Sequence, residues 1–277
     1  MRGKICMITG SSSGIGKQTA IELAAQGATV VIVCRDQAQG EAALAEIKQA
    51  SPDGLGELML ADLSSQVAVR QLAADTQRTH DHLHVLINNA GVMRTEFTKT
   101  VDGYEMTFAV NQLAPFLLTN LLLDTLKASA PARVINIMGN SGPINFDDLM
   151  GEKRYDIMKA YQQSKMANRL FTAELARRLS GTGVTVNGAD PGFVATNLGR
   201  DAKGSLKSFL DSARSTMRTV EQGAATPVYA ASAPELASTT GKVIVDKRQS
   251  TASQGANDEA NAKRLWQVCA ELTHLNV

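Results

Sequence analysis

The chain has 277 residues, of which 44% are hydrophobic and 20% charged, a composition typical of a globular protein that excludes a disordered or collagen-like one. Lys and Arg number 28 against 27 Asp and Glu, so no bulk field draws the chain to nucleic acid or to an anionic membrane. Three cysteines at unpatterned spacing, Cys6, Cys34 and Cys269, predict buried thiols in a reducing compartment and exclude a disulfide framework or a zinc site.

Short β-branched runs alternate with longer amphipathic stretches, which predicts an α/β fold with a parallel sheet covered by helices on both faces. Strands are expected at residues 5–9, 29–34, 57–60, 85–88, 133–138, 184–187 and 242–245. Helices are expected at 16–27, 38–50, 65–79, 101–128, 158–180 and 221–231. We expect one domain over residues 1–277, with a lid-like excursion at about 197–220 and a final helix at about 257–272.

The first expected strand runs into a glycine-rich turn, which reads TGSSSGIG over residues 9–16 and opens a helix. Glycines at such a turn allow a tight bend and a close approach of backbone to a pyrophosphate, and the helix N-terminus favours the anion. A turn without a ligand is the alternative, but the strand before it and the helix after it favour a dinucleotide.

The second expected strand ends in Cys34 and Arg35, without the carboxylate that usually holds the ribose 2′-hydroxyl of NAD. Arg35 offers a permanently charged fork to a 2′-phosphate, which favours NADP(H) over NAD(H). Asp36 is adjacent, but neighbouring residues of an extended segment point to opposite faces, so the two do not share this role. A solvated surface charge is the alternative interpretation of Arg35.

Several further motifs follow in order along the chain: Asp62-Leu63, Asn88-Asn89-Ala90-Gly91, Asn111, Tyr161-Gln162-Gln163-Ser164-Lys165, and Pro191-Gly192 with Thr196. With the turn at 9–16 they resemble the short-chain dehydrogenases/reductases. The strings CRD at 34–36, NFDDL at 145–149 and RLWQVCAEL at 264–272 are most similar to the retinol dehydrogenase-like branch. The resemblance implies a Rossmann-type doubly wound sheet of about seven strands in the order 3-2-1-4-5-6-7.

The resemblance also implies which residues hold the cofactor. The turn after the fourth strand would approach the adenosine ribose, Asp62 and Leu63 the adenine, and Pro191 to Val194 the nicotinamide, with Thr196 on the carboxamide or pyrophosphate. The expected cofactor-binding residues are Gly10, Ser12, Ser13, Ile15, Arg35, Asp62, Leu63, Asn89, Ala90, Gly91, Tyr161, Lys165, Pro191, Gly192, Val194 and Thr196.

Tyr161 and Lys165 are four residues apart on an expected helix, so their side chains share a face. A free tyrosine titrates near pH ~10, and we expect the nearby ammonium and a nicotinamide ring to lower that pKa. Tyr161 would then be the general acid in carbonyl reduction and the general base in alcohol oxidation. By resemblance, Lys165 also binds the nicotinamide ribose, and Asn111 holds a water that links Lys165 to solvent.

One departure from the family concerns the serine that hydrogen-bonds the substrate oxygen. Aligning the fifth expected strand with the family places Met138 and Gly139 where a Ser-Ser pair normally stands, so Gly139 replaces the catalytic serine. Ser141 is two residues further on, in a turn that contains Gly139 and Gly142. We expect Ser141, or the amide of Asn140, to reach the substrate oxygen.

Two other patterns receive less weight. His80, His82 and His84 alternate before the fourth strand, where some side chains face solvent, and no second ligand cluster supports a metal site. Apolar residues recur at helical spacing in the excursion, which is either a helix packed on the core or a lid that closes over a lipophilic substrate; they are Leu206, Phe209, Leu210, Ala213 and Met217.

The sequence therefore predicts a cytoplasmic NADP(H)-dependent alcohol dehydrogenase or carbonyl reductase of a lipophilic small molecule, without a membrane anchor. A dinucleotide-binding protein with weakened catalysis and a regulatory or interaction role is the alternative, supported by Gly139. Reduction of a carbon-carbon double bond by the same tyrosine and lysine is a third reading. Relatives often pair through the helices expected at 101–128 and 158–180, so a homo-oligomer stays open.

Overall fold

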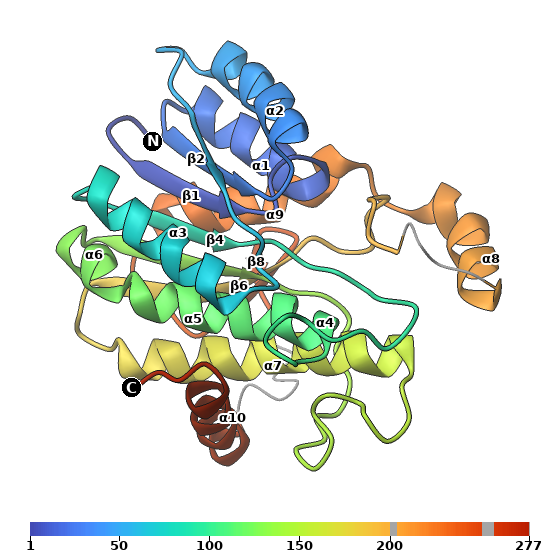
Figure 1. The fold of residues 1–277 in the computed structure, drawn as a ribbon. Coiled ribbons are helices and arrows are strands. Elements are labelled where there is room, and N and C mark those ends of the chain that lie inside the picture. The colour runs from blue at the N-terminus through green and yellow to red at the C-terminus, as the bar shows by residue number, and fades with distance from the viewer. Residues whose placement is uncertain (200–203, 251–257, 277) are drawn as a thin grey trace.

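The computed structural model describes residues 1–199, 204–250 and 258–276 (Figure 1). In this part of the chain eight strands form one sheet in the order β3-β2-β1-β4-β5-β6-β7-β8. All neighbours are parallel except β7 and β8, which form an antiparallel hairpin at the edge. The strands are β1 (Ile5–Thr9), β2 (Thr29–Cys34), β3 (Glu57–Leu60), β4 (Val85–Asn88), β5 (Ala132–Ile137), β6 (Val184–Asp190), β7 (Val243–Val245) and β8 (Arg248–Gln249). The expected doubly wound sheet is confirmed, and β8 is an addition to the seven expected strands.

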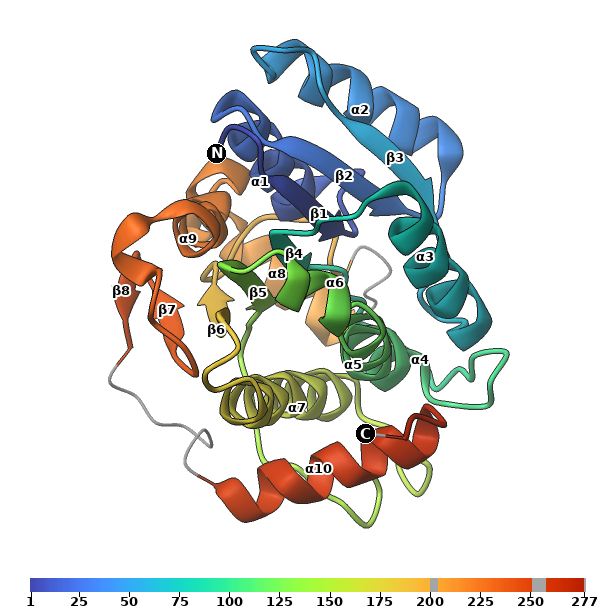
Figure 2. The same ribbon diagram turned by 90° about the vertical axis from the view of Figure 1, so that its left-hand side faces the viewer.

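Helices cover both faces of the sheet (Figure 2). One face carries α1 (Gly14–Ala25), α2 (Gln37–Ala50) and α9 (Val220–Ser232). The other carries α3 (Gln66–Thr79), α5 (Ala114–Leu121) and α7 (Ile157–Arg178), and α10 (Glu259–Leu272) packs across the outside of α7. Two apolar cores, one on each side, follow from this arrangement, because the central strands are buried on both faces.

The single helix expected at 101–128 is wrong. The structure has α4 (Met106–Phe108), a π-helical segment at Ala109–Leu113, then α5 and α6 (Leu123–Ala128). The helix cannot begin at 101 because residue 105 is bridged to residue 99, and the buried Glu105 carboxylate caps α4 by accepting from Thr107 N and Phe108 N. Pro115 lacks an N–H at the start of α5, where the backbone hydrogen bonding changes from the π-helical to the α-helical pattern.

Other boundaries move by small amounts. The first four strands match their expected ranges, whereas β5 starts one residue earlier and β6 runs on to Asp190. α10 begins at Glu259, where Asp258 caps it through Asn261 N; residue 257, the expected start, lies outside the described residues.

The excursion after residue 197 contains α8 (Gly204–Ala213), which projects away from the rest of the molecule in Figure 1. Its base is closed by backbone hydrogen bonds from Arg218 N to Phe193 O (2.8 Å) and from Ala195 N to Arg218 O (3.0 Å). The side chains of Leu206 and Phe209, expected on an apolar face, lie outside what the structure describes. In the described ranges no helix has the length and apolar character needed to cross a bilayer.

Candidate active site

The turn after β1 is closely packed against the turn after β4. Gly10 has φ +65°, and a Cβ on it would lie 2.7 Å from the Cα of Ala90. A Cβ on Gly16 would lie 2.6 Å from the carbonyl oxygen of Gly10 and would also meet the side chain of Asn89. Only glycine therefore fits at these two positions, as the motif predicted.

Hydrogen bonds lock the two turns together. Thr9 Oγ1 accepts from Asn89 N (3.0 Å) and Ala90 N (3.1 Å), and Asn89 Nδ2 donates to the carbonyls of Thr9 (2.7 Å) and Gly10 (3.1 Å). Ser11 is fully buried, and its Oγ donates to Ile8 O in β1 and accepts from Val33 N in β2. Thr9 and Ser11 were missed in the sequence, where they stood as ordinary turn residues.

The N-terminus of α1 opens beside this turn. Its N-cap residue Ser13 is extended, and no side chain caps the helix. Its first backbone N–H groups are therefore available to an anion. The Cγ2 of Thr196 lies 3.7 Å from where a Cβ on Gly14 would be, so the segment after β6 reaches this helix end. Ser12, Ser13 and Ile15 are half-buried here.

The ends of β2 and β3 lie together. Arg35 is exposed and has no ion-pair partner among the described residues. The Asp36 carboxylate instead caps α2 by accepting from Gln39 N (2.8 Å), which separates the roles of the two residues. Ala61 N donates to Cys34 O (2.9 Å), so Asp62 and Leu63 follow directly beside Arg35. The exposed Asp62 carboxylate accepts from Ser64.

Tyr161, Lys165 and Asn111 meet at the C-terminal end of the central strands. Lys165 is buried, its Nζ donates to Ile137 O (3.0 Å), and it lies 5.8 Å from the centre of the Tyr161 ring. Asn111, within the π-helical segment, accepts from Val92 N (2.8 Å) and donates to Ser164 Oγ (3.0 Å). A Cβ on Gly91 would lie 3.5 Å from Asn111 Oδ1 and 3.9 Å from Lys165 Nζ.

The pKa values in this group differ from the expectation. Burial and, second, the Asp190 carboxylate raise the pKa of Tyr161 to about 12, instead of a neighbouring ammonium lowering it. Burial lowers the pKa of Lys165 to about 8, and Asp190 partly opposes this.

Gly139 stands directly against the tyrosine. A Cβ at this position would lie 2.7 Å from Tyr161 Oη and 3.4 Å from Lys165 Cγ. The phenol therefore fills the space that a larger residue would need. Ser141 Oγ is buried without a hydrogen-bond partner among the described residues, and the next residue, Gly142, donates its N–H to Gln162 O (3.3 Å). The loop thus carries an unpartnered hydroxyl beside the second turn of α7.

After β6 the chain turns at Pro191 and Gly192. Gly192 has φ +78°, and its N–H donates to Asp190 Oδ1 (2.9 Å). Arg218 donates to Pro191 O (3.4 Å) and pairs with Asp246 (2.6 Å). Val194 packs on Gly223, which Ile15 also approaches. Asp190 and Arg218 were missed in the sequence, and the only signal is that Asp190 precedes a Pro-Gly turn.

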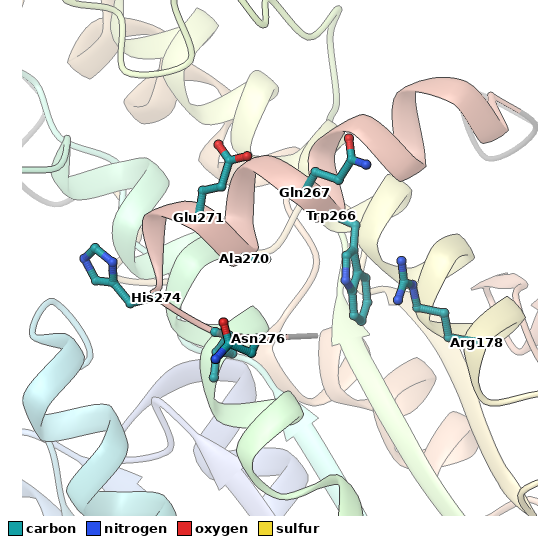
Figure 3. Close-up of a pocket in the computed structure, with 8 residues that line it drawn as sticks. Arg178, Trp266, Gln267, Ala270, Glu271, His274 and Asn276 are labelled. Carbon is teal, nitrogen blue, oxygen red and sulfur yellow. The ribbon is translucent and has the colours of Figure 1, made fainter.

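A separate hollow of about 530 Å³ lies between the C-terminal end of α7 and α10 (Figure 3). Arg178 stacks on the indole of Trp266 at 4.0 Å, and His274 and Asn276 lie further along the rim. Tyr161 is near the opposite end of α7, roughly 25 Å away along the axis. This hollow is therefore not part of the candidate active site.

The remaining titratable patterns have structural partners. All three cysteines are free and buried, as expected. His80 is buried and pairs with Glu57 (3.1 Å), and His84 Nδ1 accepts from Ile5 N. Within the described ranges no three His, Cys, Asp or Glu residues are grouped to hold a metal ion.

Comparison with known proteins identifies the chain's relatives. The family model for short chain dehydrogenase matches residues 4–206. Retinol dehydrogenase 14 of Mus musculus is 43% identical over 97% of this chain and 85% of its own length. Retinol dehydrogenase 12 of Homo sapiens is 44% identical over 98% of this chain and 86% of its own length.

Solved structures agree with this likeness. A putative uncharacterized protein from Mycobacterium Paratuberculosis has 33% identity and a TM-score of 0.80, covering 99% of this chain and 94% of its own. A structure described as the Pseudomonas aeruginosa RhlG/NADP active-site complex has 30% identity and a TM-score of 0.70, covering 88% of this chain and 94% of its own.

Proposed function

The chain belongs to the short-chain dehydrogenase family, in its retinol dehydrogenase-like branch, and we propose that it is an NADP(H)-dependent oxidoreductase acting on lipophilic alcohols, aldehydes or ketones. Membership makes it an oxidoreductase of this family. The observation that carries the finer proposal is the group formed by Tyr161, the buried Lys165 and Asn111, beside a turn in which only glycine fits.

The residues of the glycine-rich turn after β1 suit a dinucleotide. The Gly10 and Gly16 positions leave room for a close backbone approach, and the uncapped start of α1 offers N–H groups to phosphate. Ser12, Ser13, Ile15 and Thr196 would line this end. Asn89, Ala90 and Gly91 would hold the adenosine ribose, Asp62 and Leu63 the adenine, and Pro191, Gly192 and Val194 the nicotinamide.

Arg35 supports NADP(H) as the preferred cofactor. Its guanidinium is exposed and unpaired in the described chain, while the adjacent Asp36 is committed to capping α2. A relative of known structure is described with NADP, which agrees with this choice. A charge-assisted hydrogen bond is worth about 1.5–3 kcal/mol, so Arg35 would favour the 2′-phosphate by about 10- to 100-fold.

A bound nicotinamide would supply the hydride, and the chain supplies the proton. In the reductive direction Tyr161 Oη donates its proton to the carbonyl oxygen, and in the oxidative direction it accepts one. Lys165 would hold the cofactor ribose, and Asn111 would link Lys165 to solvent through a water. Ser141 Oγ, which has no partner, would take the place of the serine absent at Gly139 and donate to the substrate oxygen.

Apolar side chains border the substrate side. A Cβ on Gly199 would lie 2.9 Å from Met93 Cε and 3.2 Å from Leu210 Cδ1, so the base of α8 meets the loop after β4. Phe193 and Leu198 are 47% and 37% exposed on the same segment. These side chains suit a lipophilic substrate, with α8 as its lid. The single domain, the cytoplasmic location and a homo-oligomer stay predictions.

NADPH oxidation with a panel of lipophilic aldehydes and ketones tests the proposal. We expect turnover with one alcohol formed for each NADPH consumed. Tight NADPH binding without turnover on any member would favour the regulatory or interaction module instead. An unsaturated substrate whose product keeps its carbonyl group would point to reduction of a carbon-carbon double bond.

The cofactor preference is tested by Arg35→Ala. We expect the ratio of kcat/KM for NADPH to that for NADH to fall about 10- to 100-fold. Arg78→Ala is the matched control, because Arg78 is an exposed arginine of α3 that pairs with Asp75. An unchanged ratio in the Arg35 variant would leave Arg35 as a solvated surface charge.

A further inference from the structure

Asp190 lies in the sheet directly beside the proton-transferring group. Ile137 pairs with Ala189, and Met138 N donates to Ala189 O (2.9 Å), so Asp190 is level with Met138. The residue before Met138 offers its carbonyl to Lys165, and the residue after it, Gly139, stands against Tyr161 Oη. The end of β6 is therefore one strand away from both partners.

The Asp190 side chain points to the face that α7 covers. A Cβ on Gly188 would lie 2.8 Å from Met138 Cγ, and residues two apart on a strand share a face. Arg169 of α7 reaches the same place, with its Nη2 3.8 Å from Asp190 Oδ2. Arg169 follows Lys165 by one helical turn and Tyr161 by two, so the three side chains form a row.

The carboxylate is fixed from two sides. Its Oδ1 accepts from Gly192 N (2.9 Å) and its Oδ2 faces Arg169, and the two side chains are only 21% and 11% exposed. Water screens such a pair less than a surface pair, so its charges act on their neighbours. Desolvation makes a pair of this kind a poor source of stability, which favours another role.

Charged and titratable groups face Asp190 from each packed element. α7 contributes Tyr161, Lys165 and Arg169, and the segment before α9 contributes Arg218, which is itself paired with Asp246 after β7. The negative charge of Asp190 raises the pKa of Tyr161 and supports the protonated form of Lys165. Arg169 places a positive charge 3.8 Å from that carboxylate, and a positive charge acts on both groups in the opposite sense.

We propose that Asp190 and Arg169 form a positioning pair whose opposed charges set the pH range in which Tyr161 and Lys165 exchange protons. The pair rests on the proposed function, because it acts through that acid and base. Asp190 keeps Tyr161 protonated and ready to donate, and Arg169 limits this effect. The two residues therefore have opposite influence on one equilibrium, which a packing role would not produce.

NMR titration of isotope-labelled lysine tests the pair without turnover, with Lys165→Met to assign the signal. Asp190→Asn keeps the shape and removes the charge, so the titration midpoint of Lys165 should fall by about one pH unit or less. Arg169→Met should raise it, and Arg169→Lys should restore it. Asp246→Asn, which removes the carboxylate paired with Arg218, is the matched control and should leave it unchanged.

The pH profile of turnover gives the second readout. For carbonyl reduction Tyr161 must be protonated, so the alkaline limb should move to lower pH in Asp190→Asn and to higher pH in Arg169→Met. The proposal would be overturned if the titration midpoint of Lys165 and the alkaline limb of turnover stay fixed in both variants. It would also be overturned if they move in the same direction in both. A wild-type chain without turnover would instead refute the proposed function, and the lysine titration would still decide the pair. If Asp190→Asn does not fold, the Arg169 variants decide it alone.

Discussion

The cofactor side and the substrate side of the site are built differently. Around Gly10 and Asn89 the backbone is fixed by contacts that exclude any Cβ and by four hydrogen bonds between two turns. Around Gly139 the chain has a glycine where the resemblance implies a catalytic serine, and a buried hydroxyl of Ser141 has no partner in the described chain. Binding a shared cofactor leaves little freedom in the first region, whereas the second can vary with the substrate.

The substitution with the largest expected effect tests the cofactor side of the site. In Gly10→Ala, strain at φ +65° adds to a backbone contact of 2.7 Å, and together they would cost about 4 kcal/mol. The free energy of unfolding, measured by urea denaturation, should fall by about that amount. Gly54→Ala is the matched control, since Gly54 has φ +66° with nothing within 4 Å. Equal losses in both variants would mean that backbone strain alone matters.

Ser141→Ala tests the substrate side. Loss of a donor to the substrate oxygen should lower kcat about 100-fold while NADPH affinity stays constant. Ser232→Ala removes a hydroxyl of α9 that donates to Val228 O, and it should leave kcat unchanged. A Ser141 variant with wild-type kcat would remove this residue from the mechanism and leave the Asn140 amide as the candidate donor.

Gly139→Ala should have a smaller effect. The added methyl would displace Tyr161 Oη, which is the end of a side chain and can shift, so we expect about a 10-fold loss of kcat. Gly142→Ala in the same loop meets only the flexible side chain of Gln162 and serves as control. If Gly139→Ala is fully active, the tyrosine does not need the space that glycine leaves.

Tyr155→Phe should affect stability more than chemistry. Tyr155 Oη donates to Arg94 O (2.9 Å) and contacts Glu105 (3.2 Å), which ties the loop before α7 to the start of α4. Removing it should lower the free energy of unfolding by about 1–3 kcal/mol, measured by urea denaturation. A loss below that range would show that other contacts hold the loop.

The cofactor side of the site was also easier to predict from the sequence than the substrate side. The first four strands and the glycine turn follow from local patterns, because β-branched runs and positive-φ glycines act within a few residues. The break at the π-helical segment was not predicted, because it depends on Glu105 capping α4 and on Pro115. Apolar periodicity alone cannot reveal it.

Electrostatics at the tyrosine could not be read from the sequence for a related reason. The spacing of Tyr161 and Lys165 predicts a shared face, and the structure brings them together with Asn111. The effect of Asp190 depends on the register of β5 and β6, which joins residues far apart in the chain. Burial then reverses the expected direction of the tyrosine pKa.

The central claim is that Tyr161 transfers the proton, and Tyr161→Phe tests it most directly. NADPH oxidation with the best aldehyde of the panel should fall about 100- to 10,000-fold, while NADPH affinity stays at the wild-type value. A variant that keeps kcat within a few-fold of wild type would contradict the account.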